Sequence, residues 1–399
     1  MNIAIFTDVF LPKIDGIVTS TIELATEFAR QGHQVLIIAP KSQGVPDALP
    51  EKKIRLLYVP SLPSFMYPEM RMGFLSLPTY RAIKHFQPEI IHIVSPSTLG
   101  LFGQFVSSRL KVPSVGVFHV NFMKPEYLEI VGIRRGVRQV EAVLWEYARI
   151  FFAASEAVIS PSQGIKKDLL GHGFRESVKV CPNGIKIDTQ LSERTAANLQ
   201  RLRQQYRLAG DKTLIYVGRL SKEKALDRLL RVFKLVLAAD ADVRLLLFGD
   251  GPIKAELEAY AQELGIDHAT VFWGQVEHQR LLDEQLFRLG KIFCTCSTSE
   301  VQPMSMIEAM CFGLPVIVPD NLAMQELIQG NGFLVSPPDS EAHFCQKILT
   351  LLRDEALYQQ LSTASLEASK YFRIEHSVTY YLEVFRDVVR GHNSVNLIN

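Results

Sequence analysis

The chain has 399 residues, of which 47% are hydrophobic and 21% charged, and its formal net charge is +1. This length exceeds one ordinary hydrophobic core and predicts at least two domains, and the composition excludes a disordered or fibrous protein. A net charge near zero excludes a global field that attracts nucleic acid, so any basic patch must be local and we expect no nucleic-acid partner.

Cysteine usage and the first residues bear on the cellular compartment. The five cysteines show no paired metal-type spacing, and Cys294 and Cys296 lie in an apolar run that suits buried free thiols in a reducing cytoplasm. The first strand-like run starts at residue 2, which leaves no room for a signal peptide, and no apolar run approaches the roughly 18 residues of a membrane helix. We expect a cytoplasmic protein, soluble or peripheral on the inner face of the cytoplasmic membrane.

The first half opens with a strand at residues 2–7 and a glycine-containing loop. An amphipathic helix follows at about residues 17–31, ended by Gly32, and residues 34–40 predict the next strand. Further strands are expected at "EIIHIVSP", "VPSVGVFHV" and "AVISPS", with helices between them.

The second half begins in the same way. Residues 213–217 predict a strand, residues 218–224 form a loop, and apolar residues then recur at helical spacing from Leu226 to Leu237. Later strands are expected at "VRLLLFGDGP", "ATVFWGQV", "KIFCTCS" and "LPVIVPD".

Continuous apolar strands that alternate with helices predict parallel sheets covered on both faces. The predicted fold class is α/β, with two doubly wound domains facing one another. The expected parts are an N-terminal domain, a polar linker, a C-terminal domain and a final helix that crosses back to the first domain, at residues 1–186, 187–211, 212–374 and 375–399. Ligands of such sheets bind at the carboxyl ends of strands, so the chemistry is sought in the loops that follow them.

The loop after residue 217 carries Gly218, Arg219 and Lys224, with Lys222 nearby. Arginine offers a planar fork matched to phosphate oxygens, and lysine adds a point charge beside a helix N-terminus. An ordinary solvated loop explains these residues equally well when they are taken alone. The position at the carboxyl end of a strand favours a diphosphate site.

The segment "FGDGP" also follows a strand whose apolar composition predicts that it is buried. Gly249 and Gly251 allow a tight turn, Asp250 can cap the next helix, and Pro252 suits its first turn. A well-formed turn between strand and helix accounts for this by itself. The glycines would also let a nucleotide approach the backbone.

Glu300 and Glu308 flank the start of a predicted helix that follows "KIFCTCS", with Pro303 in its first turn. Backbone N–H groups around Met304 to Met306, including that of Ser305, could receive a phosphate there. The two carboxylates could then accept hydrogen bonds from hydroxyls on either side, a layout that suits a nucleotide-sugar. A capping carboxylate beside a surface glutamate is the structural alternative, and the acid/base pair of a glycosidase is the chemical one. A glycosidase has no use for a cationic phosphate loop.

In the first half, Gly16 lies in the first loop, where backbone can approach a ligand closely. This loop lacks G-x-G-x-x-G, which argues against a dinucleotide dehydrogenase. His119 follows a predicted strand and either packs in the core or faces a substrate.

The segments "VGRLSKEKALDRLL", "FGDGP" and "SEVQPMSMIEAMCFGLPVIV" together resemble the retaining glycosyltransferases of family 4, which have the GT-B fold of two facing Rossmann-like domains. The similarity runs from "IAIFTDVFLPKIDGIVTS" to "GFLVSPPD". The stretch "IIHIVSPSTLGLFG…FHVNF" resembles more narrowly the branch of sulfoquinovosyl- and glucosyl-diacylglycerol synthases and related mannosyltransferases.

This resemblance implies a role for each matching residue. Arg219 and Lys224 would clamp the donor diphosphate, Glu308 would bind the ribose and Glu300 the donor sugar. The implied catalytic residues are His119, Arg219, Lys224 and Glu300. The implied donor site is Gly16, Gly218, Arg219, Lys224, Gly249, Asp250, Gly251, Glu300, Met304, Ser305 and Glu308, and the implied acceptor side is Asp15, His119 and Asn121.

The resemblance also implies the chemistry. Such enzymes use no protein nucleophile, and the leaving phosphate helps to deprotonate the acceptor on the same face of the sugar. They use no cofactor and no metal ion, because the basic pair replaces a cation electrostatically. Ala225 and Pro303 stand where many members have glycine, and Val120 and Asn121 also depart from the lipid-synthase pattern, so the sugar and the acceptor stay open.

Two segments bear on the acceptor. Residues 61–86 are rich in aromatic residues, methionine and proline, and residues 133–152 combine arginines with apolar positions at helical spacing. Each is either ordinary surface or part of a membrane-facing patch for a lipid acceptor.

We expect a retaining hexosyltransferase that uses UDP-glucose or GDP-mannose and a glycerolipid acceptor. The alternatives are a soluble sugar or polysaccharide acceptor and, more distantly, a nucleotide-sugar epimerase or a non-catalytic binding protein.

Overall fold

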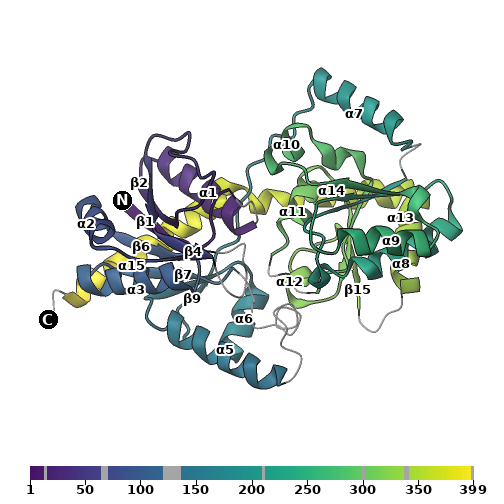
Figure 1. Ribbon diagram of the computed structural model, residues 1–399. Coiled ribbons are helices and arrows are strands. Elements are labelled where there is room, and N and C mark those ends of the chain that lie inside the picture. Colours follow the sequence, from purple (N-terminus) through teal and green to yellow (C-terminus); the bar gives the residue numbers. More distant parts are fainter. Residues whose placement is uncertain are drawn as a thin grey trace. The chain divides into compact units, whose positions relative to one another are not determined.

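The computed structural model describes residues 1–12, 16–63, 71–119, 136–208, 212–298, 300, 302–336 and 341–396. The chain divides into two compact units (Figure 1). The first comprises Met1–Lys186 and Arg373–Asn399, and the second comprises Ile187–Phe372.

In the first unit, the described residues form a parallel sheet of seven strands in the order β3-β2-β1-β6-β7-β8-β9. The strands are β1 (Asn2–Phe6), β2 (Gln34–Pro40), β3 (Ile54–Val59), β6 (Ile90–Ile93), β7 (Ser114–Val117), β8 (Ala157–Ser160) and β9 (Val178–Val180). The helices are α1 (Gly16–Arg30), α2 (Leu77–Phe86), α3 (Thr98–Leu110), α5 (Val137–Phe152), α6 (Gln163–Gly171) and α15 (Ile374–Asn396). Strands β4 (Ser61–Pro63) and β5 (Arg71–Gly73) pair antiparallel beside this sheet.

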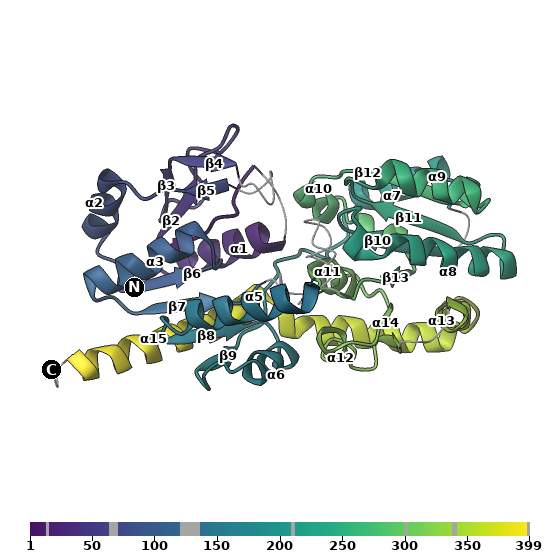
Figure 2. The same cartoon turned by 60° about the horizontal axis from the view of Figure 1, so that its bottom comes forward.

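Helices α1 and α15 cover one face of the first sheet. Tyr381 and Phe385 of α15 are buried with Phe28 of α1 and with Ile3 and Ile5 of β1. Figures 1 and 2 both show α15 running along this sheet, although it is the last helix of the chain. Helices α3 and α5 cover the opposite face, so the unit has three layers, as apolar parallel strands require.

The second unit contains a parallel sheet of six strands among its described residues, in the order β12-β11-β10-β13-β14-β15. The strands are β10 (Thr213–Val217), β11 (Arg244–Phe248), β12 (Thr270–Gly274), β13 (Ile292–Cys294), β14 (Val316–Pro319) and β15 (Gly332–Val335). The α-helices are α7 (Glu193–Gln205), α8 (Leu226–Ala239), α9 (Lys254–Glu263), α10 (His278–Asp283), α11 (Met304–Cys311), α12 (Leu322–Gln325), α13 (Glu341–Arg353) and α14 (Glu355–Ser369). The 3-10 helices are η1 (Lys222–Lys224), η2 (Asp267–Ala269), η3 (Leu286–Leu289) and η4 (Lys370–Phe372).

The apolar residues whose helical spacing predicts α8 form its buried face. Leu226, Leu229, Leu230, Phe233 and Val236 are all buried, and this face packs with α13 and α9 on one side of the second sheet. Helices α11 and α14 contact each other and lie with η3 on the other side.

The polar stretch expected as a linker, 187–211, belongs to the second unit as far as it is described. Its helix α7 is fixed to the region of α10 and η3, because Arg203 donates to the carbonyl of Arg288 (2.7 Å) and Asn198 donates to the carboxylate of Glu284 (3.2 Å). Side-chain contacts on this helix thus make it part of a domain rather than a free connection.

A buried histidine lies beneath α15. His92 of β6 is 2% exposed and packs edge-on against Tyr381, with ring centroids 5.5 Å apart. Burial lowers the pKa of His92 from 6.5 to about 3, and the neighbouring His119 acts in the same direction. The native first unit therefore holds this imidazole neutral at pH values where the unfolded chain protonates it.

The first unit should consequently lose stability as the pH falls from about 6.5 towards 3. In this window the unfolded state binds a proton that the native state does not, so unfolding free energy falls by up to about 1.4 kcal/mol per pH unit. His92→Leu should remove the His92 share of this dependence and leave the shares of His119 and His33, whose pKa values burial also lowers. Urea unfolding at pH 7 and pH 5.5 measures the difference, and an unchanged pH slope in the variant would exclude His92 as its source.

Candidate functional site

The second sheet reverses its winding between β10 and β13. From β10, the chain proceeds to β11 and β12 on one side, and then to β13, β14 and β15 on the other. The loops that leave the carboxyl ends of β10 and β13 diverge at such a point, where ligands of open α/β sheets bind. Lys224 follows β10 and Glu300 follows β13.

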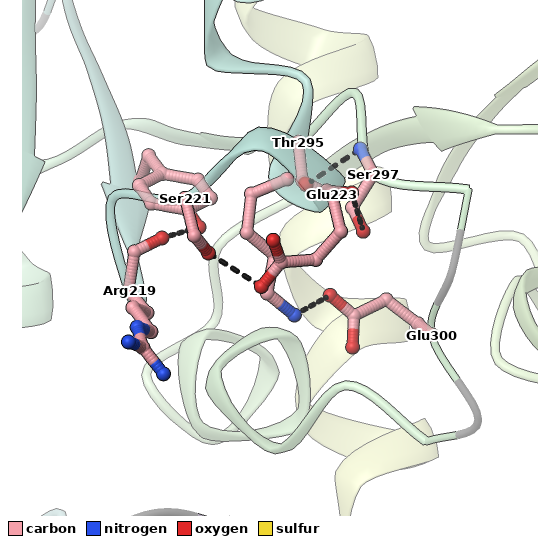
Figure 3. A network of polar contacts seen from close by, with 8 residues as sticks. Arg219, Ser221, Glu223, Thr295, Ser297 and Glu300 are labelled. Atoms are coloured by element: carbon pink, nitrogen blue, oxygen red, sulfur yellow. Dashed lines mark hydrogen bonds and ion pairs between the residues drawn. The ribbon is translucent and has the colours of Figure 1, made fainter. Parts of the chain in front are cut away.

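Lys224 and Glu300 form an ion pair at this point. Lys224 Nζ lies 2.6 Å from Glu300 Oε1, and the two side chains are 20% and 18% exposed (Figure 3). The sequence predicts that these groups serve different parts of one ligand, and the structure brings them into contact. A phosphate bound here would therefore pair with Lys224, and a sugar hydroxyl would donate to Glu300. Each would replace a partner in the present ion pair.

Arg219 lies in the same loop but apart from this pair (Figure 3). Its side chain is exposed, while its carbonyl accepts a hydrogen bond from the hydroxyl of the buried Tyr216 at 3.2 Å. Burial raises the pKa of Tyr216, so the phenol stays protonated and remains a donor. Tyr216, which sequence analysis did not select, thus fixes the backbone from which the guanidinium projects.

Two further contacts order η1, one within its own segment and one that joins it to the loop after β13. The Ser221 hydroxyl donates to the carboxylate of Glu223, and the Ser297 hydroxyl donates to the carbonyl of Glu223 at 3.4 Å (Figure 3). Ala225 then follows with φ +49°, in the left-handed region. Glycine adopts this conformation freely, whereas an alanine held in it costs about 1 kcal/mol of backbone strain. Alanine in place of the glycine of many family members therefore carries this small strain.

The glycines of "FGDGP" allow two loops to meet. A Cβ on Gly249 would lie 1.9 Å from the carbonyl oxygen of Gly218, and one on Gly251 would lie 2.3 Å from that of Leu220. Backbone hydrogen bonds join the loops, since Leu220 N donates to Asp250 O at 2.9 Å. These glycines therefore serve backbone packing beside the Arg219 loop, a reason that sequence analysis did not give.

The expected helix cap at Asp250 is wrong. Helix α9 begins at Lys254 with Ile253 as its N-cap, and Asp250 accepts from the backbone N–H of Gly251 at 2.8 Å instead. Pro252 precedes the helix rather than lying in its first turn. Because the backbone of Asp250 is bonded to Leu220, the residue belongs to the loop pair and is placed too early to reach the helix.

Helix α11 begins at Met304, with Pro303 as its N-cap. Met306 N donates to the Pro303 carbonyl at 3.1 Å, so this N–H is used within the helix, contrary to expectation. Met304 and Ser305 are half-buried in the first turn. Glu308 lies one turn further on, and it is buried.

Glu308 does not join the Lys224–Glu300 pair. Its Oε1 lies 2.8 Å from Nε2 of His278, the first residue of α10. Sequence analysis missed His278, although the residue follows strand β12 by four positions and the rule that selected His119 would also have found it.

The other predicted residues belong to the first unit. Gly16 is exposed and begins α1, and His119 is half-buried two residues after β7. Burial lowers the pKa of His119 to about 4, so its imidazole is neutral at pH 7. Asp15, Val120 and Asn121 lie outside the described residues.

Asp8 is a buried carboxylate that the sequence analysis did not select. It follows β1 at the switch between β1 and β6, and its Oδ1 accepts from the Thr98 hydroxyl at 2.7 Å and from Leu99 N at 2.9 Å. Burial raises its pKa, and these hydrogen bonds oppose the rise. Asp8 therefore caps α3 and holds the carboxyl edge of the first sheet in place.

Two family models match the chain. Glycosyltransferase Family 4 matches residues 14–189, and Glycosyl transferases group 1 matches residues 199–367. Together they match most of both units and leave out residues 1–13, 190–198 and 368–399.

Relatives and solved structures agree with these models. An alpha-monoglucosyldiacylglycerol synthase of Streptococcus pneumoniae is 28% identical, over 84% of this chain and 74% of its own length. A GDP-mannose-dependent alpha-mannosyltransferase of Mycobacterium tuberculosis is 28% identical, over 90% of each chain. The crystal structure of Anabaena HepE in complex with UDP and glucose superposes with a TM-score of 0.76 at 21% identity, covering 97% of this chain and 100% of HepE.

The two parallel-sheet units thus define a glycosyltransferase of GT-B fold, as the sequence predicts. The chain belongs to the retaining glycosyltransferases of family 4, with a group 1 domain as its second half. The predicted enzyme class, a hexosyltransferase, is confirmed by both models and by the relatives.

Proposed function

We propose that this chain transfers a hexose from a nucleoside-diphosphate sugar to a hydroxyl of a glycerolipid. The observation that carries the proposal is the Lys224–Glu300 pair at the switch of the second sheet, with Arg219 in the same loop. A diphosphate takes the cations and sugar hydroxyls take the carboxylate. The activities for which the relatives are named, including that of a sulfoquinovosyl transferase of Arabidopsis thaliana, support a nucleotide-sugar donor and a lipid acceptor.

In this proposal, the first unit is the acceptor-side domain and the second binds the donor. The bond between the sugar's anomeric carbon and the diphosphate breaks, the acceptor oxygen bonds to that carbon, and the acceptor proton passes to the leaving phosphate. Arg219 and Lys224 stabilise the charge that develops on the phosphate, without a metal ion or cofactor. His119, neutral at pH 7, serves as a hydrogen-bond partner of the sugar rather than as an acid.

The test is a transfer assay with radiolabelled UDP-glucose and GDP-mannose, with and without a bacterial lipid extract and with and without EDTA. Counts that enter chloroform only when lipid is present, and that persist in EDTA, are the expected result. A labelled product that stays in the water phase would show that the acceptor is a soluble sugar rather than a lipid. Intact donor in every arm, from a folded protein, would contradict transferase activity with these donors.

The described part of the first unit offers a surface for the lipid. Five apolar side chains are exposed on the adjacent helices α3 and α5: Leu101, Phe105, Val143, Tyr147 and Ile150, the α3–α5 patch. The Tyr147 hydroxyl donates to the Pro96 carbonyl at 2.8 Å, which ties α5 to the start of α3, and the exposed Arg138 adds a positive charge. No helix among the described ranges has the length and apolarity needed to cross a bilayer, so the proposal is peripheral attachment from the cytoplasmic side.

Replacing Val143 and Ile150 together with serine should lower sedimentation with phosphatidylglycerol vesicles several-fold, because both side chains are more than half exposed and can enter the interface. Affinity for free UDP should not change. Leu235→Ser is the matched control, an exposed apolar residue on α8 of the second unit. If the wild type stays in the supernatant at low salt, the patch is ordinary surface.

A further inference from the structure

Glu308 is a carboxylate almost removed from solvent. Its side chain is 4% exposed, whereas that of its partner His278 is 26% exposed. A buried carboxylate is stable in its ionised form only when it receives hydrogen bonds. The His278 Nε2–Glu308 Oε1 contact of 2.8 Å supplies one of them.

The pair joins two loops that leave the sheet on opposite sides of its switch. His278 follows β12, beyond β11 on one side of β10, and Glu308 lies on the helix that follows β13 on the other side. A ligand bound across the carboxyl ends of β10 and β13 therefore meets the Glu308 carboxylate. That carboxylate is held by His278, which comes from the β12 end of the sheet. Neither backbone alone would fix the direction of the Glu308 side chain.

An ionised carboxylate has two oxygens with about four acceptor positions. Contact with His278 uses Oε1 and leaves acceptor capacity on Oε2. The two neighbouring hydroxyls of a ribose are donors of the kind that such an oxygen binds.

We propose that His278 is a positioning residue for ribose recognition, and that it holds Glu308 oriented so that the carboxylate accepts the ribose hydroxyls of the donor nucleotide. This inference rests on the proposed function, in which the second unit binds a nucleoside-diphosphate sugar. It adds a specificity-determining side chain from α10, outside the loops of Arg219, Lys224 and Glu300.

The experiment is a calorimetric comparison of UDP and GDP with their 2′,3′-dideoxy analogues. The wild-type protein should bind the better ribonucleotide about 10- to 100-fold more tightly than its dideoxy analogue, since the analogue leaves a buried acceptor unpaired. His278→Phe, which keeps a ring but removes the donor, should reduce this ratio to about 3-fold or less. The loss should fall on the ribonucleotide and leave affinity for the dideoxy analogue unchanged.

Two variants serve as matched controls. His278→Gln retains an N–H donor and should restore most of the ratio, and His268→Phe changes an exposed histidine of the same unit and should have no effect. Thermal denaturation of each variant verifies that the second unit is folded.

The outcomes separate the two levels of the proposal. A wild-type ratio retained in His278→Phe, or an equal loss of affinity for both nucleotides, would overturn the role of His278. A wild type that binds the dideoxy and ribonucleotides equally would overturn ribose recognition by Glu308. A folded wild type that binds none of the four would overturn the proposed function itself.

Discussion

Lys224→Met should lower turnover of the nucleotide-sugar by about 100- to 1,000-fold, the usual effect of removing one preorganised charge from a transition state. The variant loses the cation that balances the leaving diphosphate. It also leaves the Glu300 carboxylate, 18% exposed, without the ammonium group that lies 2.6 Å away. Steady-state kcat and KM for the donor measure the effect, with circular dichroism as the check on folding.

A double-mutant cycle with Glu300→Gln tests whether the ion pair is exchanged for the donor. In Glu300→Gln, Lys224 is released to the diphosphate, so affinity for UDP should rise by about 5- to 10-fold while affinity for the intact nucleotide-sugar falls. The rise should vanish in the Lys224→Met background. A rise that persists there would mean that Glu300 only repels the diphosphate, and no rise at all would mean that the pair opens without cost.

Gly249→Ala should destabilise the second unit by about 2–4 kcal/mol, because its Cβ would lie 1.9 Å from a backbone oxygen that two hydrogen-bonded loops hold in place. Nucleotide affinity should fall as well, since the displaced Gly218 adjoins Arg219. Urea unfolding measures stability, with the fluorescence of Trp273 in a Trp145→Phe background reporting the second unit alone.

Gly265→Ala is the control for Gly249→Ala. Gly265 also has a positive φ, +73°, but a Cβ there meets nothing within 4 Å. It should cost only about 1 kcal/mol of backbone strain. Equal losses in the two variants would show that backbone strain, rather than the clash between loops, decides the effect at Gly249.

The sequence was sufficient to predict the two sheets and the loops that carry polar residues. Apolar strands alternate with amphipathic helices, and parallel strands have their carboxyl ends at one edge, so Lys224 and Glu300 could be assigned to the same edge of one sheet. Their direct contact could not be predicted. It joins residues 76 positions apart, and it depends on β10 lying next to β13, which only the strand order reveals.

The remaining misses have local causes. The sequence predicts Asp250 as a helix cap because capping patterns consider only the helix that follows along the chain. In the structure, a backbone hydrogen bond to Leu220 of the neighbouring loop decides the position of Asp250. His278 carries no motif, and its importance comes from a partner 30 positions away on another element. Patterns along the chain identify edges and loops, while the pairing of side chains across loops requires the fold.

Helix α15 has a consequence for the biosynthesis of this protein. Tyr381 and Phe385 complete the core of the first unit, yet they are translated after the whole second unit. The second unit is a continuous segment inserted into the first, and Ile374 N bonds to Ile185 O at 3.0 Å where the chain returns. On the ribosome the first-made domain must therefore wait with its α15-facing core uncovered, and the later-made domain is the one able to fold first.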